Sequence, residues 1–430
     1  MTEPHTEPLP IEVEAAAAWR GLVKNFGTLL LGEGAAAFFG LVTFLLLARN
    51  LGPAGFGLVS VGIALVGWLS LGVDSGTEIL SLRNVSRDPA GFRELAERIL
   101  GLRIVTSLTV AAVYLVIIGI GTRSPSNRAV YLGFVVALPA IALNLRWIVL
   151  GIGGARAVAV GNLAARIVFL CGVVLAVVPH HAVAHVPFAY ATGEFVYAGA
   201  IFLMVARRFG VLVPRIDVAF WVATLRESIP VMISSYARGI QFSFDVLLIG
   251  FVLGPRDAGF FSAAQKPVLF FGTVIGLFYV SFVSSYSAAA SEFASLVLRR
   301  AVRTSLVVTL PVAFTVAAVA EFVIPIAFGH RYENAAPVLA ILAWKIPFSA
   351  LTAPFSGLLI GTGQTVVLMR NNVITAAVTV LGNLLAVPLV GIPGAAIVGV
   401  VSSATILTLN YRSAASRKLA PPLRALLARA

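Results

Sequence analysis

Charged residues are scarce in this sequence of 430 residues, where Asp, Glu, Lys and Arg make up only 11%, against about 25% in a typical soluble domain. Hydrophobic residues make up 59%, and the mean hydropathy is +0.98. These values exclude an ordinary soluble enzyme, a disordered chain and a nucleic-acid-binding protein. The net charge of +13 fits a membrane protein, because the charges form short clusters between long apolar runs, as in cytoplasmic loops.

Cysteine is almost absent, since Cys171 is the only one, and no disulfide can form within the chain. A basic segment at the start is also missing, whereas a secretory signal begins with one. The first 24 residues instead carry Glu3, Glu7, Glu12 and Glu14. We therefore expect a polar N-terminal tail, residues 1–24, before an uncleaved first span.

Long apolar runs recur twelve times, and about 20 apolar residues are enough to cross a bilayer as a helix. The predicted spans are 25–48, 56–77, 100–122, 130–152, 157–179, 186–206, 228–253, 257–284, 302–325, 335–361, 365–388 and 391–411. The sequence thus predicts an all-α integral membrane protein with two pseudo-repeated six-helix lobes around a central cavity. The lobes are residues 25–206 and 228–411, joined by a cytoplasmic linker at 207–227 and followed by a basic tail at 412–430.

The distribution of Lys and Arg predicts the orientation in the membrane. With the N-terminus inside, 21 of these residues fall in cytoplasmic segments and 5 in outward segments. Cytoplasmic loops of membrane proteins are enriched in Lys and Arg. We therefore expect both termini to be cytoplasmic.

Two stretches of the sequence repeat. LGPAGFGLVS at residues 51–60 matches LGPRDAGFFS at 253–262 at a constant offset of 202 residues, and Asn162 matches Asn372 at an offset of 210. Both matches place spans one to six on spans seven to twelve. Transporters are often built from two such halves, with the substrate route between them.

Four motifs together resemble a known family. They are ARNLGPAGFG at 48–57, DVLLIG followed by LGP at 245–255, FGHRY followed by AAPVL at 328–339, and GIPGAA at 391–396. In this order they resemble the O-antigen and exopolysaccharide flippases of the multidrug/oligosaccharidyl-lipid/polysaccharide exporter superfamily.

The resemblance implies a V-shaped pair of lobes that moves an undecaprenyl-pyrophosphate-linked oligosaccharide across the bacterial inner membrane by alternating access. It implies three kinds of partner: the lipid-linked oligosaccharide, the lipid bilayer, and a polysaccharide polymerase with other assembly proteins. A cation-coupled multidrug exporter, a lipid II flippase and a membrane-embedded polymerase or ligase remain alternatives. Lipid II flippases often have fourteen spans, however, and this chain has room for twelve.

Four cations lie near the middle of their predicted spans: Arg166, Arg238, Lys266 and Lys345. A charge at that depth costs about 2.5–3.5 kcal/mol on insertion scales, so it normally faces a cavity or a partner. We expect these cations and Gln241 to bind the pyrophosphate and sugars, with Arg238 and Lys266 opposite each other across the cleft. The alternative is that the charges pair across the helix bundle, for example Glu33 with Arg238.

Carboxylates inside the spans are candidates for carrying a coupling cation, and these are Glu33, Glu194 and Asp245. Near the cytoplasmic ends of their spans, Asp74 and Glu78 are expected to pair with Arg83 or Arg87, and Arg146 is expected to extend toward the membrane surface.

Enzymatic chemistry is not predicted. The sequence has no nucleotide-binding P-loop, no evident nucleophile and base pair, and no outward loop large enough for a polymerase. His180, His181 and His185 have no acidic residue or cysteine nearby, so we expect no metal site and no cofactor.

The predicted orientation can be tested with an alkaline phosphatase fused to the C-terminus, because this enzyme is active only outside the cytoplasm. We expect an inactive fusion in a bacterial host. An active one would contradict the cytoplasmic placement of the termini.

Overall fold

A computed structural model describes residues 30–87, 92–122, 124–286, 291–417 and 419–422, and for 30–31, 87, 274–286 and 291–297 it describes the backbone alone. Every regular element in these ranges is a helix. The predicted all-α class is therefore confirmed.

The first half begins with η1 (Leu30–Gly34), which continues into α2 (Ala35–Asp74). α2 contains two spans, because the backbone turns at Gly52, where φ is 67°, and Pro53 starts the second span. The other elements of this half are α3 (Thr77–Arg87), α4 (Phe92–Gly121), α5 (Pro125–Gly133), η2 (Phe134–Ala137), α6 (Leu138–Ala142), α7 (Arg146–Gly151), α8 (Ala155–Gly172), η3 (Val173–Val177), η4 (Val183–His185) and α9 (Val186–Phe209).

The second half follows after a non-helical segment at residues 210–217. Its elements are α10 (Val218–Val252), α11 (Pro255–Tyr286), α12 (Ser291–Ala318), α13 (Ala320–Phe328), η5 (His330–Ala335), α14 (Ala336–Leu342), α15 (Lys345–Gly361), α16 (Thr365–Val390) and α17 (Ile392–Ser416).

The described helices supply the twelve predicted spans. Nine helical segments in this part of the chain are long and apolar enough to cross a membrane, and one of them, Gly32–Asp74, holds two spans because of the turn at Gly52. α10 and α11 have 35 and 32 residues, which exceeds the length that a bilayer about 30 Å thick requires.

The sequence repeat is also a structural repeat. Gly52 and Gly254 both have positive φ, at 67° and 106°, and a proline follows each glycine at the start of the next span. Asn162 Nδ2 donates to Glu33 Oε2 at 3.0 Å, and Asn372 Nδ2 donates to Ser234 Oγ at 3.5 Å. Each asparagine thus joins the fifth span of its half to the first, as expected of two six-helix lobes.

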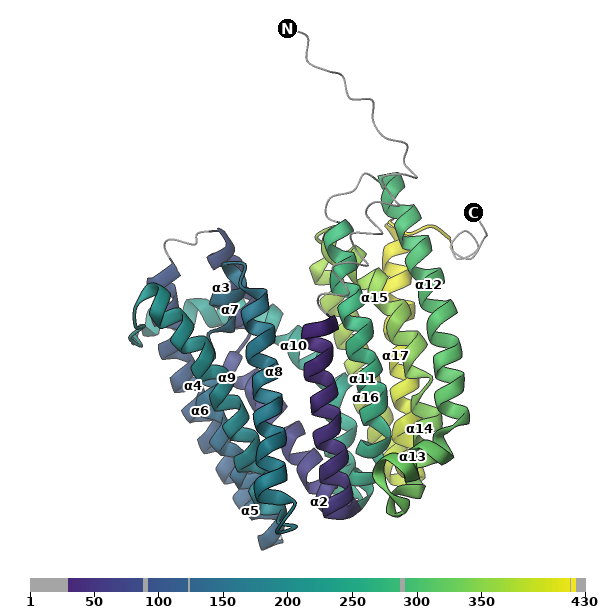
Figure 1. Ribbon diagram of the computed structural model, residues 1–430. Coiled ribbons are helices and arrows are strands. Elements are labelled where there is room, and N and C mark those ends of the chain that lie inside the picture. Colours follow the sequence, from purple (N-terminus) through teal and green to yellow (C-terminus); the bar gives the residue numbers. More distant parts are fainter. Residues whose placement is uncertain (1–29, 88–91, 123, 287–290, 418, 423–430) are drawn as a thin grey trace.

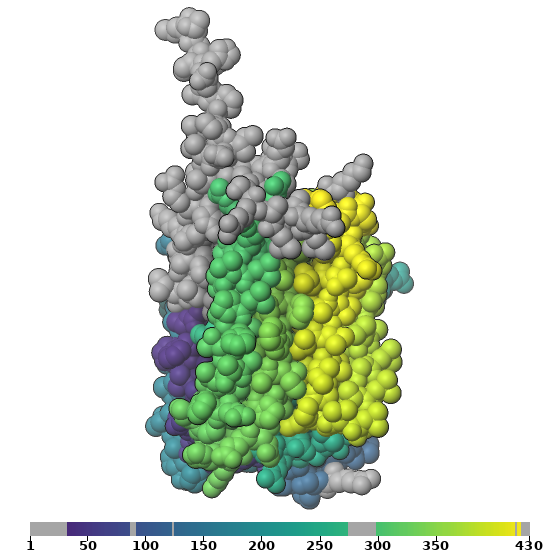
Figure 2. Space-filling model, turned by 90° about the vertical axis from the view of Figure 1, so that its right-hand side faces the viewer, coloured from purple at the N-terminus to yellow at the C-terminus, as the bar shows by residue number. Residues whose placement is uncertain are grey.

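The two halves form a V (Figure 1), with α2 and α10 between the other helices of the first half and those of the second. They are closest at the end of the molecule that carries the turn at Gly52, which we call the Gly52 end. The largest buried cluster lies there and includes Phe56, Phe261, Phe328 and Tyr332. Figure 2 shows the outer face of the second half, where α12 and α17 run along the molecule. Exposed apolar side chains such as Val307 and Phe314 cover α12, as a lipid-facing surface requires.

The start of α10 packs against the first half. The Asp217 carboxylate caps α10 by accepting from Phe220 N at 2.9 Å and pairs with Arg98 Nε at 3.3 Å. Trp221 Nε1 donates to the Arg98 carbonyl at 3.0 Å. α10 therefore reaches from α4 of the first half into the second half, and it contributes to the cavity between them.

Candidate functional site

A cavity of about 780 Å³ lies between the helices of the first half and α10. Ile63, about 15 Å along the helix from Pro53, and Asp74, at the far end of α2, both line the cavity. The cavity therefore extends from mid-depth to the end of the molecule opposite Gly52. The buried cluster around Phe56 and Tyr332 closes the Gly52 end.

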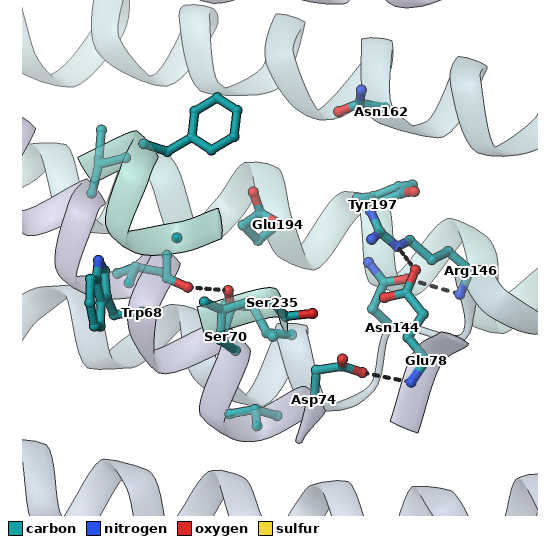
Figure 3. A pocket seen from close by; sticks show the side chains of 18 of the residues that line it. Trp68, Ser70, Asp74, Glu78, Asn144, Arg146, Asn162, Glu194, Tyr197 and Ser235 are labelled. Atoms are coloured by element: carbon teal, nitrogen blue, oxygen red, sulfur yellow. Dashed lines mark hydrogen bonds and ion pairs between the residues drawn. The ribbon is translucent and has the colours of Figure 1, made fainter. Parts of the chain in front are cut away.

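Charged side chains of both signs line the cavity in equal number, and Figure 3 labels four of them, Asp74, Glu78, Arg146 and Glu194. The full set is Glu33, Asp74, Glu78, Glu194, Arg103, Arg146, Arg166 and Arg238. The lining is thus neutral in sum, and its chemistry depends on which of these charges are paired with each other.

Two ion pairs lie toward the end of the cavity that is farthest from Gly52. Arg103 Nη2 is 2.5 Å from Asp74 Oδ1, and Arg146 Nε is 2.6 Å from Glu78 Oε1. Arg103, which is 3% exposed, also donates to the Asn144 carbonyl at 3.0 Å. The expected pairing of Asp74 and Glu78 with Arg83 is therefore wrong, and the Arg87 side chain lies outside the described residues. Arg103 and Arg146 come from neighbouring spans, and this contact across helices replaces the local one.

Arg166 and Arg238 form no ion pair with any residue that the structure describes. Arg238 donates to Ser234 Oγ at 3.4 Å and to Ser235 Oγ at 3.2 Å, both on the preceding turn of its own helix. These long bonds leave the guanidinium exposed to the cavity. The alternative pairing of Glu33 with Arg238 is not formed.

Two carboxylates share the cavity with these cations. Glu33 Oε2 accepts from Asn162, and Glu194 lies farther along the wall (Figure 3). Neither has an ion-pair partner in the described part of the chain. Two of the three predicted ion-coupling carboxylates are therefore in the cavity.

The structure does not bring Lys266 and Lys345 into the cavity lining. Lys266 Nζ lies 3.7 Å from the centre of the Phe44 ring, a cation–π contact between α11 and α2. Lys345 Nζ lies against α17, only 3.3 Å from where a β-carbon on Gly399 would be. Lys266 therefore does not face Arg238 across the cleft.

Gln241 and Asp245 also lie outside the lining and contact the helices of the second half. Gln241 Nε2 donates to the Asn372 carbonyl of α16 at 3.2 Å. Asp245 is 4% exposed, and it accepts from Val246 N at 2.8 Å and Gln265 Nε2 at 3.4 Å. Both side chains connect neighbouring helices, a common use of polar groups inside a membrane.

Trp68 is a cavity residue that the sequence analysis missed. Its Nε1 donates to Ser243 Oγ at 2.9 Å, and its ring lies edge to face with Tyr236 at 6.1 Å. These contacts fix the indole between α2 and α10, in the wall of the cavity. A tryptophan within an apolar run does not differ in sequence from one that faces lipid, so no sequence signal distinguished it.

Two of the three histidines of the 180–185 segment contact backbone carbonyls. His181 Nδ1 is 3.3 Å from the Asn50 oxygen, and His185 Nδ1 is 2.9 Å from the Ala176 oxygen. Within the described ranges, no group of three or more His, Cys, Asp or Glu residues has a geometry that could hold a metal ion.

The fold is similar to that of solved membrane transporters, among them members of the MOP superfamily. The structure is similar to the lipid II flippase MurJ in an inward closed conformation, with a TM-score of 0.76 at 14% identity over 93% of this chain and 89% of that chain. It is also similar to an inward-facing multidrug resistance MATE family transporter, with a TM-score of 0.70 at 13% identity over 89% and 94% of the two chains. For an outward-facing MATE transporter the TM-score is 0.62 at 18% identity, over 93% and 96%.

The particular family follows from the sequence. Residues 22–285 match the polysaccharide biosynthesis protein family, and the chain therefore belongs to that family. Among proteins with curated functions, none has significant sequence similarity to this chain. The predicted family is thus confirmed, and the motifs at 48–57 and 245–255 lie within the matched residues.

The two ion pairs of the cavity are expected to differ in their effect on stability. Arg103→Ala leaves the Asp74 carboxylate without its cationic partner in a largely buried position. Loss of one partner of a buried pair costs about 3–5 kcal/mol of folding stability. Arg146→Ala breaks a pair whose side chains are 47% and 21% exposed, so we expect about 0–1 kcal/mol. Thermal unfolding in detergent and abundance in the membrane measure the difference. The Asp74→Ala/Arg103→Ala double variant should recover part of the loss, and equal losses for Arg103→Ala and Arg146→Ala would contradict the assignment.

Proposed function

We propose that this protein is a flippase that binds the anionic head of a lipid-linked oligosaccharide in its cavity and moves it across the bacterial inner membrane by alternating access. The termini are then cytoplasmic, the cavity opens to the cytoplasm, and the substrate is an undecaprenyl-pyrophosphate-linked repeat unit for polysaccharide synthesis. The observation that carries this proposal is the pair of guanidinium groups, Arg166 and Arg238, in a cavity where the other two arginines are paired with carboxylates.

The chemistry of the substrate explains why unpaired arginines are useful here. A pyrophosphate carries fixed negative charge, which is costly in a medium of low dielectric constant. A guanidinium offsets this cost and presents a planar fork that can bind two phosphate oxygens at once. The sugars need hydrogen-bonding groups and an apolar face to pack on, and Trp68, Ser70, Asn144 and Ser235 of the cavity provide both.

The similarities support the same proposal. Membership of the polysaccharide biosynthesis family favours a substrate of that pathway class, and the likeness to a lipid II flippase favours a lipid-linked sugar over a soluble one. The TM-score is higher with the inward-facing MATE transporter than with the outward-facing one, which supports a cavity that opens toward the cytoplasm. A polymerase and other assembly proteins are the partners that such a flippase would have.

A cation-coupled exporter of drugs is the second candidate. It is favoured by the carboxylates Glu33 and Glu194 in the same cavity and by the likeness to MATE transporters. The unpaired arginines disfavour it, because a cationic drug would meet two positive charges on entry.

Arg238 is the residue through which the flippase proposal can be tested. Arg238→Ala removes a charge-assisted contact worth about 1.5–3 kcal/mol, so we expect the apparent affinity for the substrate to fall about ten- to a hundredfold. Arg238→Lys keeps the charge without the planar fork and should retain part of the activity. Export of the lipid-linked sugar and abundance in the membrane are measured together.

Arg370→Ala is the matched control, because it removes one exposed arginine from α16, outside the cavity lining. It should export normally. Normal export by both Arg238→Ala and Arg166→Ala would contradict the anion site, whereas loss of Arg238→Ala protein from the membrane would indicate a structural role.

Coupling to an ion gradient gives a separate test, since the sequence has no nucleotide site. If Glu33 or Glu194 carries the coupling cation, collapsing the proton and sodium gradients should stop transport in vesicles. Glu33→Gln and Glu194→Gln should then reduce transport even with both gradients intact. Asp245→Asn is the comparison outside the cavity. Transport that continues after both gradients have collapsed would exclude the coupled mechanism for these residues.

A further inference from the structure

The two copies of the repeated motif pack against each other at the Gly52 end. A β-carbon built on Gly57 would lie 1.7 Å from the Pro255 oxygen, and one built on Gly259 would lie 2.0 Å from the Pro53 oxygen. Gly57 corresponds to Gly259, and Pro53 to Pro255, at the repeat offset of 202 residues. The contact is therefore reciprocal, with the backbone of each half touching the backbone of the other. We call it the glycine–proline closure.

Three further contacts join the halves beside this closure. Tyr332 Oη, on η5, donates to the Ala48 carbonyl of α2 at 2.9 Å. Arg49 Nε donates to the Ala327 carbonyl of α13 at 2.8 Å, and its Nη2 contacts the Ile326 carbonyl. Phe56 packs edge to face on Tyr332 at 6.2 Å. The halves are thus sealed by packing and by hydrogen bonds to main-chain oxygens.

The serine that ends each copy of the motif is buried in an unusual way. Ser60 is 4% exposed and Ser262 is 1% exposed, and neither hydroxyl has a hydrogen-bond partner among the described residues. A buried hydroxyl without a partner is unfavourable. Water would reach both hydroxyls if the halves moved apart at this end. The hydroxyls would then regain the hydrogen bonds to water that they lack in the closed state.

We propose that the glycine–proline closure is the gate at the Gly52 end, and that Gly57 and Gly259 are glycines because the gate seals by direct backbone contact. A side chain at either position holds the halves apart, so the gate cannot close. This inference rests on the proposed alternating access, but it concerns the gate alone and holds for any transported molecule.

Other close glycines do not have this arrangement. A β-carbon on Gly101 would lie 2.2 Å from the Arg215 oxygen, and one on Gly62 would lie 2.2 Å from the Phe134 ring. Phe134 is in the same half as Gly62, and Arg215 is in the segment that leads out of that half. These contacts pack the first half and its linker. The reciprocal pair formed by Gly57 and Gly259 lies where the two halves must separate.

The test uses labelling of a single cysteine from one side of the membrane. Cys171→Ser removes the only native cysteine, and Ser60→Cys or Ser262→Cys then reports on access to the closure with a nearly isosteric side chain. A membrane-impermeant maleimide is added to either side of sealed vesicles, without any transport substrate. Gly57→Ala and Gly259→Ala are compared with Gly40→Ala and Gly272→Ala, whose added methyl groups would meet no atom within 4 Å.

We expect Gly57→Ala and Gly259→Ala to raise the labelling rate at least about tenfold from the side that faces the Gly52 end, since a closure that cannot form leaves the reporter in water. The two control glycines should leave the rate unchanged. Tyr332→Phe removes one hydrogen bond across the closure without adding an atom there, and it should raise the rate by a smaller factor at normal abundance.

Unchanged labelling in Gly57→Ala and Gly259→Ala at normal abundance would overturn the gate. If both glycine variants are lost from the membrane, the labelling rate of Tyr332→Phe is the test instead. An unchanged rate in that variant would also overturn the gate. Because no substrate is present, these outcomes are independent of the Arg238 experiment, and a failure of the gate can be distinguished from a failure of the anion site.

Discussion

A charged side chain inside a bilayer needs either an opposite charge or water, and this constraint organises the interior of the protein. Arg103 and Asp74 meet the constraint by pairing with each other, as do Arg146 and Glu78. Arg166 and Arg238 meet it by lining the cavity. Two of the four cavity arginines have carboxylate partners, so the charges without an ion-pair partner among the described residues are Arg166 and Arg238 on one side of the balance and Glu33 and Glu194 on the other.

The duplicated halves use equivalent positions for different purposes. The first half supplies most of the cavity wall, and α10 supplies the part that carries Arg238. In the second half, Gln241 and Asn372 bond across α10 and α16, and Asp245 is buried beside Gln265. Polar groups at comparable depths thus stabilise helix packing in one half and face the cavity in the other. The duplication preserves the backbone arrangement, while the side chains determine which half lines the cavity.

Contact between the halves at the Gly52 end depends on two positions that have no side chain. Glycine at residues 57 and 259 allows two helix backbones to meet, and close backbone approach is a common way for helices to associate inside a membrane. Each contact of this kind is weak, and the closure also includes the bond from Tyr332 to the Ala48 carbonyl and the bonds from Arg49 to the Ala327 and Ile326 carbonyls. Among the described residues, no ion pair joins the two halves at this end.

The sequence by itself determined the membrane class and the twelve spans, because these depend on the length of the apolar runs and on the charges between them. It also determined the duplication and the family, because these depend on local motifs such as the glycine–proline pairs at residues 52–53 and 254–255. It also identified Arg166, Arg238, Glu33 and Glu194 as charges at membrane depth, and these four line the cavity. Only the tertiary structure decided that Lys266 rests on Phe44, that Arg103 pairs with Asp74, and that Trp68 faces the cavity. Depth along a helix follows from residue number, but the direction in which a side chain points depends on which neighbouring helix packs beside it. That neighbour comes from a distant part of the chain.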